Sequence, residues 1–485
     1  MSTLNEDASY GQHPSHPDSA IRMASSVHRF HLPEMGWGNN GPGTSVSFSR
    51  AFRTSGQCDE TKLLMLQSDA ARLDLAQALS AGSGRNKHTE VIRTSQEYLP
   101  LIHQVLSSCK AHPDGAILDE RLLFEWSSGI EKAKSSKKED RFSKSEALMY
   151  DLVMTIVCEG LGHVGMACDN CIEGKFANSS KSLKVAAGIF DFLATVQLPK
   201  WISKGTTVTE KELPIECNVG TCEALKELFL GIAQQMAVAT VLVKPEKPNY
   251  KLVAKLCLGN CARFEEFTRT LRNKANGQMT RIDSSFYTLL TFQITLQKAL
   301  SNYFQARAAW DDDEYGIAIC MLNEASTLMR TRSSPTGKGI PDIDSKSSLR
   351  ALISDISDFK KHISSLMQLW ESDNSTIYFC KVPSSVPNNM VISQGTIMMK
   401  TIPFSLSEAK PLLLSAPLKS LSGASAPPPT APGMNDNPPP PTTPHVDVGQ
   451  PPPYSAIDNL SANREMSDRD LARELQAKIN AGEDV

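Results

Sequence analysis

Three glycines have a spacing that is typical of a chemical motif. Gly160, Gly162 and Gly165, in the stretch EGLGHVG, match a dinucleotide-binding loop, in which glycines let the backbone approach a pyrophosphate. The preceding run EALMYDLVMTIVC instead has apolar residues at helical intervals, and no acidic residue follows at the distance that would hold a ribose. The sequence therefore favours a tight helix connection at these glycines over a nucleotide site.

Two cysteine pairs have spacings that suit a metal or redox site. Cys168 and Cys171, in CDNC, have the two-residue gap that lets two thiolates converge on one ion. The second pair, Cys217 and Cys222, has a gap of four residues, which fits a structural zinc site poorly. The pattern favours unrelated thiols, and a metal- or nucleotide-dependent helical enzyme remains the alternative function. No nucleophile motif accompanies any serine, cysteine or carboxylate.

Composition places the chain among proteins with a large core. Its 485 residues are 40% hydrophobic and 21% charged, and the net charge of -3 gives no general attraction to nucleic acid or anionic membranes. Eleven irregularly spaced cysteines and an N-terminus without a basic start or an apolar run predict a cytoplasmic protein with reduced thiols. No apolar stretch is expected to span a membrane, so membrane work would depend on partners.

The composition changes along the chain and divides it into four regions. Residues 1–34 are predicted to form a disordered tail, and 35–405 a single, nearly all-helical body. Residues 406–466 are rich in Pro, Ser and Ala and are predicted to be a disordered linker. Residues 467–482 then return to a helical pattern, so a short amphipathic helix is expected near the C-terminus.

Apolar stripes at steps of three and four residues predict the helices of the body. They comprise Leu225, Leu228, Phe229, Ile232 and Met236; Leu289, Phe292, Leu296, Ala299 and Tyr303; and Ile319, Leu322, Ala325 and Met329. Short extended elements are expected at 44–52 and 377–382, where polar and apolar residues alternate.

Collinear motifs in the helical region resemble the Bro domain family, which includes Alix and its relatives. They read LLFEWSSGI, VAAGIFDFL, LKELFLGIAQQMA, KLVAKLCLGNCARFEEF, YGIAICML and IYFCKVP in that order. The resemblance implies a mainly α, boomerang-shaped Bro domain with a tetratricopeptide-like helical core and a small sheet. It also implies a non-catalytic adaptor of ESCRT assemblies, which is recruited from the cytoplasm to endosomal or plasma membranes.

A narrower resemblance points to the PalC branch of this family, the fungal members of ambient-pH signalling. The opening FHLPEMGWGNNGPGTSVSFSRAF is similar to that branch, and FEW and YGIAI accompany it. The insertion NNGPG and the ending GEDV depart from the branch. The implied role is alkaline-pH signalling, with general endosomal sorting as the alternative.

The family resemblance implies a groove for the C-terminal helix of the main ESCRT-III filament subunit. Carried onto this chain, the groove lies on the helix YKLVAKLCLG, with Leu252 and Leu256 as its apolar floor and Lys255 as its basic rim. Ala237 and Val238 stand where the family has an aromatic wall, which predicts a shallower groove. The competing interpretation is that Leu252 and Leu256 face the core, as a leucine pair on a helix usually does.

The stretch PPPYSAID predicts a ligand for WW domains. Pro451 and Pro452 favour a polyproline II conformation before binding, and Tyr454 completes the P-P-x-Y pattern. WW domains occur in ubiquitin ligases of the Nedd type, so such a ligase is an expected partner. The alternative is that the proline run is only a spacer.

The C-terminal stretch SDRDLARELQAKINAG has helix signals at both ends. Ser467 and Asp470 have capping-box spacing, and Gly482 stands where a helix often ends. Leu471, Ala472 and Leu475 are similar to inverted ubiquitin-interacting helices, so ubiquitin is a candidate partner. The alternative is an amphipathic helix that docks elsewhere. No cofactor is expected at any of these sites.

Overall fold

The computed structural model describes residues 46–53, 58–80, 86–131, 142–202, 212–334, 337–342 and 352–414. Most of them lie in helices: α2 (Phe48–Ala51), α3 (Asp59–Ser80), α4 (Lys87–Ala111), α5 (Leu148–Ile172), α6 (Phe176–Phe192), α7 (Leu198–Ile202), α8 (Val219–Leu242), α9 (Tyr250–Lys274), α10 (Ser284–Asp311), α11 (Tyr315–Leu328) and α12 (Leu352–Asp373). Short 3-10 and π segments are Pro113–Gly115, Leu193–Gln197, Ile215–Cys217, Asn276–Arg281 and Asn374–Tyr378. The predicted mainly helical fold is confirmed.

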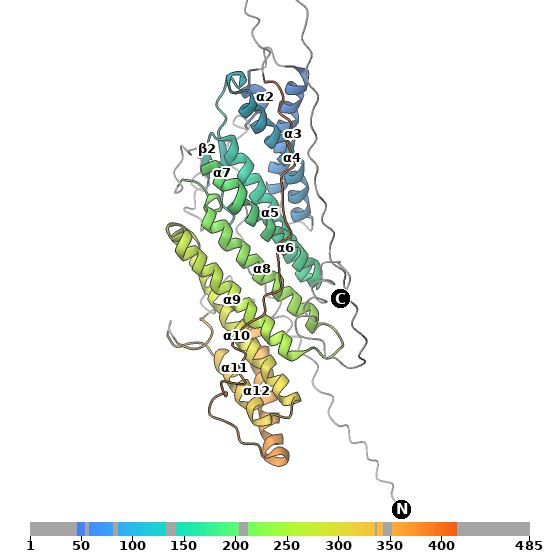
Figure 1. Cartoon of the computed structure of the whole chain (residues 1–485), viewed down its shortest axis with the longest axis vertical. Coiled ribbons are helices and arrows are strands. Elements are labelled where there is room, and N and C mark those ends of the chain that lie inside the picture. The colour runs from blue at the N-terminus through green and yellow to red at the C-terminus, as the bar shows by residue number, and fades with distance from the viewer. Residues whose placement is uncertain are drawn as a thin grey trace, which may run out of the picture.

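The long helices form one elongated stack. α3 to α6 pack in chain order, α6 packs on α8, and α8 to α12 continue the series, so that α3 and α12 lie near opposite ends (Figure 1). Neighbours in the sequence are therefore neighbours in space, as in tetratricopeptide-like arrays. A line of paired helices of this kind offers long faces on which an extended segment can lie.

The three predicted apolar stripes all face the core. Each of their residues is at most 3% exposed, on α8, on α10 and along α11 to its C-cap. Asparagines fix where two of the central helices begin: the Asn218 side chain accepts a hydrogen bond from the Thr221 backbone N–H, and Asn249 accepts one from Leu252. The helical period in the sequence therefore identified these elements correctly.

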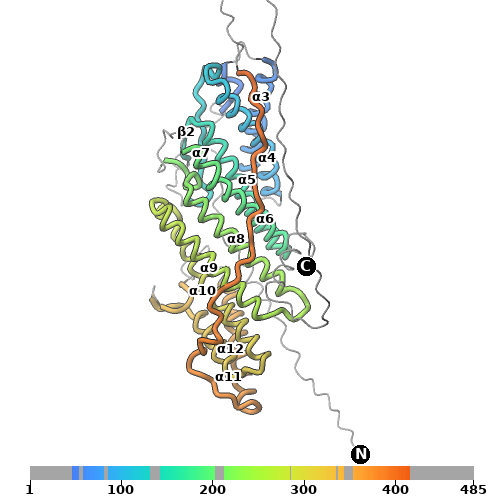
Figure 2. The backbone as a smooth tube through the Cα atoms, in the orientation of Figure 1, coloured from blue at the N-terminus to red at the C-terminus, as the bar shows by residue number. Residues whose placement is uncertain are grey.

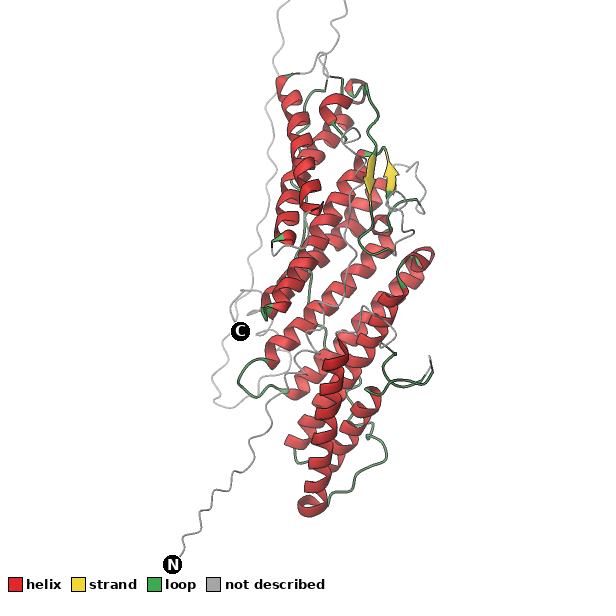
Figure 3. Ribbon diagram, turned by 180° about the vertical axis from the view of Figure 1, so that it is seen from behind, coloured by secondary structure: helices red, strands yellow, loops and turns green. Residues whose placement is uncertain are grey.

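A two-stranded antiparallel sheet lies beside the helices (Figure 3). β1 (Phe124–Trp126) pairs with β2 (Ser143–Ser145), so that Phe124 faces Ser145. The extended element expected within 44–52 is wrong for its described part, because residues 48–51 form α2. Its first turn is held by Asp69, whose carboxylate accepts hydrogen bonds from the Ser49 backbone N–H and side-chain hydroxyl.

The extended element expected at 377–382 is also wrong in its first half. Asn374–Tyr378 forms a π turn, closed by a 2.7 Å hydrogen bond from the Phe379 backbone N–H to the Asn374 carbonyl. The Asn374 side chain then bonds both the N–H and the carbonyl of Cys380 at 2.9 Å. Alternation in the sequence could not reveal this reversal, because one amide side chain makes it.

Asp151, in the first turn of α5, is the centre of a fully buried polar cluster. Its carboxylate accepts hydrogen bonds from the Arg72 guanidinium at 3.1 and 3.2 Å, from the Tyr98 hydroxyl at 2.5 Å and from the Trp126 indole at 2.8 Å. These residues lie on α3, α4 and β1. One carboxylate therefore joins four elements at the N-terminal end of the body.

α5 and α8 are long and apolar enough to cross a bilayer by length and composition alone. However, 78% and 83% of their most apolar windows are buried within the protein. Helices that are apolar on all sides and covered by neighbours are typical of the centre of a large helical domain. Both helices are core elements of the stack.

Glu216 is a second buried carboxyl group, just before α8. Its Oε1 accepts hydrogen bonds from the Ser128 hydroxyl at 2.9 Å and from the Gly129 backbone N–H at 2.6 Å, and Oε2 has no hydrogen-bond partner among the described residues. Burial, with a smaller contribution from Glu131, raises the pKa of Glu216 from 4.5 to about 7. The neighbouring pair of Glu131 and Arg281 lies 2.5 Å apart and links the same loop to the segment after α9.

The pKa of Glu216 predicts how stability depends on pH. Because the folded state holds this proton more tightly, the stabilisation is complete below pH 4.5 and falls as the pH rises to about 7. The shift corresponds to about 3 kcal/mol. Glu216→Gln should remove this slope and melt above wild type at pH 8, which thermal unfolding at pH 5 and pH 8 measures. Glu212→Gln, at an exposed position, is the control and should keep the wild-type dependence of stability on pH. An equal change in stability between pH 5 and pH 8 in wild type and Glu216→Gln would disprove the role of Glu216.

Candidate partner-binding surface

Residues 395–414, hereafter the strap, run in an extended conformation along one face of the helical stack (Figure 2). The strap crosses α9, α8, α6, α4 and α3 in that order, against the direction of the chain. It contains no helix or strand. The strap therefore connects helices that are far apart in the sequence.

Gln234 of α8 clamps the first part of the strap. Its side-chain NH₂ donates to the Leu256 and Thr396 carbonyls, both at 2.9 Å, and its Oε1 accepts from the Met398 backbone N–H at 2.8 Å. Thr396 also donates its backbone N–H to the Lys255 carbonyl at 2.9 Å. Since Gln234 is completely buried, these bonds are shielded from water, and losing one would leave a buried polar group unpaired.

Two helical glycines let the strap approach the helix backbones closely. An added Cβ at Gly188 of α6 would lie 1.8 Å from the Ile402 carbonyl oxygen, and one at Gly259 of α9 would lie 2.1 Å from that of Thr396. Ile402 in turn donates its backbone N–H to the Lys184 carbonyl at 3.0 Å. These contacts need the absence of a side chain, which explains glycine inside two long helices.

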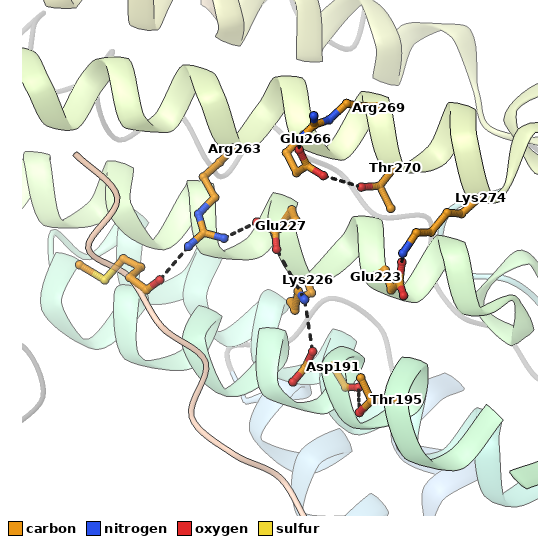
Figure 4. A network of polar contacts seen from close by, with 11 residues as sticks. Asp191, Thr195, Glu223, Lys226, Glu227, Arg263, Glu266, Arg269, Thr270 and Lys274 are labelled. Atoms are coloured by element: carbon orange, nitrogen blue, oxygen red, sulfur yellow. Dashed lines mark hydrogen bonds and ion pairs between the residues drawn. The ribbon is translucent and has the colours of Figure 1, made fainter. Parts of the chain in front are cut away.

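A ladder of charged side chains extends from the strap across three helices (Figure 4). Arg263 of α9 pairs with Glu227 of α8, and its second nitrogen donates to the Met399 carbonyl of the strap at 2.9 Å. Lys226 bonds Asp191 of α6 at 3.3 Å. Positive and negative groups alternate here, so this part of the surface does not favour an acidic or a basic partner by net charge.

The end of the strap lies on α4 and α3. His103 bonds the Ser407 carbonyl at 3.0 Å, Gln104 donates to that of Lys410 at 3.0 Å, and Leu412 donates its backbone N–H to Ser108. Leu414 is fully buried. Residues 406–414 therefore belong to the folded body, and the boundary predicted at 405 lies too early. The composition of this segment does not reveal its packing, because hydrogen bonds of its backbone, rather than a row of apolar side chains, hold it on the helices.

The predicted floor of the ESCRT-III groove is not exposed. Leu252 and Leu256 are 4% and 0% exposed and belong to the hydrophobic core, as do Ala237 and Val238 of α8. The core-facing interpretation of the leucine pair therefore holds, because their face of α9 packs against α8 and α10. Lys255 alone of the five predicted residues is partly exposed, one turn before Gly259 and beside the strap.

The helices and the strap together match a known domain family. The sequence profile of the BRO1-like domain matches residues 56–423, which include the strap and the helices from α3 to α12. The chain belongs to the BRO1-like domain family. The match ends beyond Leu414, in agreement with the packed end of the strap.

Solved structures of Bro1 domains have the same fold as this BRO1-like domain. One, described as the structural basis for endosomal targeting by the Bro1 domain, has a TM-score of 0.55 at 14% identity over 77% of this chain and 92% of that chain. An ALIX BRO1 complex with CHMP4C gives 0.55 at 14%, over 79% and 98%. ALIX with the SIVmac239 PYKEVTEDL late domain gives 0.54 at 15%, over 79% and 50%. No curated protein sequence matches the chain.

The glycines of EGLGHVG lie inside helix α5 of the BRO1-like domain. Both a nucleotide loop and the predicted tight connection are therefore wrong. An added Cβ would lie 2.9 Å from the Phe190 side chain at Gly160, 2.9 Å from Ile92 at Gly162 and 2.1 Å from His88 at Gly165. The glycines let α4 and α6 pack closely against α5, which is a structural reason for their spacing.

Three of the four cysteines in these pairs lie in surroundings that disfavour the thiolate. Cys168 and Cys171 are near the end of α5, and burial raises the pKa of Cys168 to about 12. Cys217 and Cys222 are buried near the start of α8, and burial also raises their pKa values. Within the described ranges no three metal-ligating side chains come together. This placement favours the interpretation of unrelated thiols.

An aromatic cluster at the far end of the BRO1-like domain was not predicted from the sequence. Trp310 of α10 stacks on Trp370 of α12 at 4.3 Å between ring centroids, and Tyr315 of α11 stacks on Tyr378. Phe379 follows with φ of +52° and is 74% exposed. The signal available in the sequence was the stretch IYFC, which places Tyr378 and Phe379 next to each other.

The tail motifs lie outside the described residues. They are Pro451, Pro452 and Tyr454 of the WW motif, and Leu471, Ala472 and Leu475 of the C-terminal helical pattern. The N-terminal region 1–34 also lies outside them, as does 415–466 of the predicted linker. The predictions made for these segments stand as sequence-based expectations.

Proposed function

We propose that this protein is a non-catalytic adaptor that binds the C-terminal helix of the ESCRT-III filament subunit. The observation that carries the proposal is membership of the BRO1-like domain family over residues 56–423. A solved ALIX BRO1 complex with CHMP4C, which shares the fold, supports the choice of partner. On this proposal the protein is recruited from the cytoplasm to endosomal or plasma membranes through its partners.

The proposed contact centres on the outer face of α9 around Lys255. An amphipathic guest helix would lie beside the strap, with acidic residues near this ammonium group. The neighbouring ladder of Arg263, Glu227, Lys226 and Asp191 pairs opposite charges and would hold the helices and the strap in place beside this contact. Leu252 and Leu256 are not part of this contact, because both side chains are buried in the core.

Lys255→Glu is expected to weaken binding of an ESCRT-III C-terminal helix peptide about tenfold or more, because it places like charges at the contact. Fluorescence anisotropy with a labelled CHMP4C-type peptide measures this. Lys361→Glu on α12 makes the same charge change on an exposed helix and should bind like wild type. Equal affinity of Lys255→Glu and Lys361→Glu would show that the guest binds elsewhere.

We also propose that the PPPY motif recruits a WW-domain ubiquitin ligase. Tyr454→Ala should remove binding of Nedd-type WW domains, because the tyrosine pocket is then empty, and it should leave ESCRT-III binding unchanged. Isothermal titration of the full chain with a WW domain measures the first effect. If the variant binds WW domains as tightly as wild type, the proline run acts only as a spacer.

The proposed ubiquitin contact of Leu471, Ala472 and Leu475 and the role in alkaline-pH signalling rest on sequence resemblance. Titration of labelled ubiquitin with residues 464–485 tests the first, and unchanged amide shifts at millimolar peptide would reject it. Deleting the gene for this protein in its host tests the role in alkaline-pH signalling. A pH-signalling member should lose the alkaline response with cargo sorting intact, whereas a general sorting scaffold should lose sorting.

A further inference from the structure

The outer face of α3 carries an apolar stripe that no described element covers. Leu63, Leu66 and Leu73 are 54%, 58% and 55% exposed, and exposed Ala70 lies between the last two. Their spacing of three, four and three residues places them on one side of the helix over three turns. Single exposed leucines are common on protein surfaces, but an aligned row on one helix is typical of a docking face.

Both ends of the described chain meet α3. At the N-terminal end, the Phe48 backbone N–H bonds the Asp69 carboxylate of α3 at 2.5 Å. At the other end, the Thr61 hydroxyl of α3 donates to the Leu413 carbonyl at 2.6 Å. The described chain therefore ends beside the first turn of α3, because Leu413 contacts Thr61, which is two residues before Leu63.

The C-terminal region contains one segment whose pattern suits this stripe. Within 467–482, Leu471, Leu475 and Ile479 recur every four residues, so a helix would present them on one face over about 12 Å. Leu63 to Leu73 span about 15 Å of α3. The connecting residues 415–466 can extend up to roughly 170 Å, which is several times the length of α3.

We propose that residues 467–482 dock as a helix on the stripe formed by Leu63, Leu66, Ala70 and Leu73 of the same chain. Both partners present a narrow apolar row, the arrangement by which two helices pack side by side. A helix of this length is marginal alone and gains most of its stability from such a contact. Covalent connection raises its local concentration to the millimolar range, so even a small interface would be occupied.

The charges beside the two rows are compatible with this contact. Asp59 and Asp74 lie next to the α3 row, and Lys62 pairs with Asp59 at 3.5 Å. In 467–482, Lys478 flanks Leu475 and Ile479 and can face an acidic neighbour on α3. Surface pairs of this kind would set the register of the helices more than their affinity.

Docking on α3 would hide Leu471 and Leu475, which are also two of the proposed ubiquitin contacts. Ubiquitin and α3 would then compete for one apolar face, so that the protein displays its ubiquitin-binding helix only when the tail is released. The docking itself does not depend on the adaptor function, since it follows from α3 and the tail sequence alone.

Hydrogen–deuterium exchange of the full-length protein tests the proposal. Amides of 467–482 should exchange about tenfold more slowly in the wild type than in a free peptide of residues 464–485, because docking protects them. Leu66→Asp combined with Leu73→Asp should abolish this protection. Leu369→Asp on α12, where the leucine is 51% exposed, makes the same change far from α3 and should leave the protection intact.

A second measurement does not use the double aspartate variant of α3. A cysteine placed by Leu66→Cys should react with maleimide faster when Leu471 and Leu475 are both changed to Asp, as read from the α3 peptide by mass spectrometry. The proposal would be overturned if residues 467–482 are not protected in the wild type, or if they stay protected in the α3 variant. It would also be overturned if the protection appears only with dimerisation at higher concentration. Protection of residues 1–45 instead, lost on the same α3 change, would also overturn it.

Discussion

Asp151→Asn is expected to lower the free energy of unfolding by about 3–5 kcal/mol, because it leaves the Arg72 guanidinium charged and buried without its carboxylate. Arg72 is only 3% exposed and Asp151 is 0% exposed, so water cannot solvate the guanidinium in place of the lost carboxylate. The Tyr98 hydroxyl and the Trp126 indole also lose a charged acceptor. Chemical denaturation of the full chain measures the loss.

The double variant Arg72→Gln with Asp151→Asn separates the buried charge from the lost hydrogen bonds. It should be destabilised by less than the sum of the two single changes, because neither charge is then stranded. Asp119→Asn removes an exposed carboxylate that pairs with Arg53 at 3.0 Å and should cost less than about 1 kcal/mol. A similar cost for Asp151→Asn and Asp119→Asn would contradict the role given to the buried cluster.

Gly188→Ala is expected to displace the strap from α6. The added Cβ would meet the Ile402 carbonyl oxygen at 1.8 Å, which is far inside contact distance, so either the strap or the helix must move. We expect a loss of about 1–3 kcal/mol. Peptides covering 395–414 should exchange hydrogen faster, and a protease should cut the strap sooner than in the wild type.

Gly277→Ala is the matched control for the strap. In the described part of the chain, no atom beyond the two adjacent residues lies within 4 Å of the position of an added Cβ at Gly277, which lies in the short helix after α9. This variant should keep the wild-type exchange of 395–414. Unchanged exchange of the strap in Gly188→Ala would mean that the close contact is relieved elsewhere and that the strap is not held by the glycine.

The elements that apolar periodicity governs could be predicted from the sequence. The stripe ending at Tyr303 and the one ending at Met236 lie on buried helix faces, as their spacing indicated. The same periodicity could not show whether Leu252 and Leu256 face the core or line a partner-binding groove, because a pattern shows only that residues share one face of a helix. Which face a neighbouring helix covers is decided by tertiary packing.

The strap could not be predicted for a different reason. Its hydrogen bonds are made by backbone groups, such as those of Thr396 and Ile402. Its closest contacts are possible because Gly188 and Gly259 have no side chain. Neither feature has a local sequence period. Asp151 was also hidden, because its partners Arg72, Tyr98 and Trp126 come from separate elements whose pairing requires the fold.

Equilibrium titration of the full-length protein with an intact ESCRT-III filament subunit, and with the same subunit lacking its C-terminal helix, tests the adaptor function most directly. We expect saturable one-to-one binding to the intact subunit and a roughly hundredfold or greater loss of affinity without the helix, a difference of about 3 kcal/mol. Lys255→Glu should weaken only the interaction with the intact subunit. Equal binding of both subunits, or no binding to either, would contradict the proposed adaptor function.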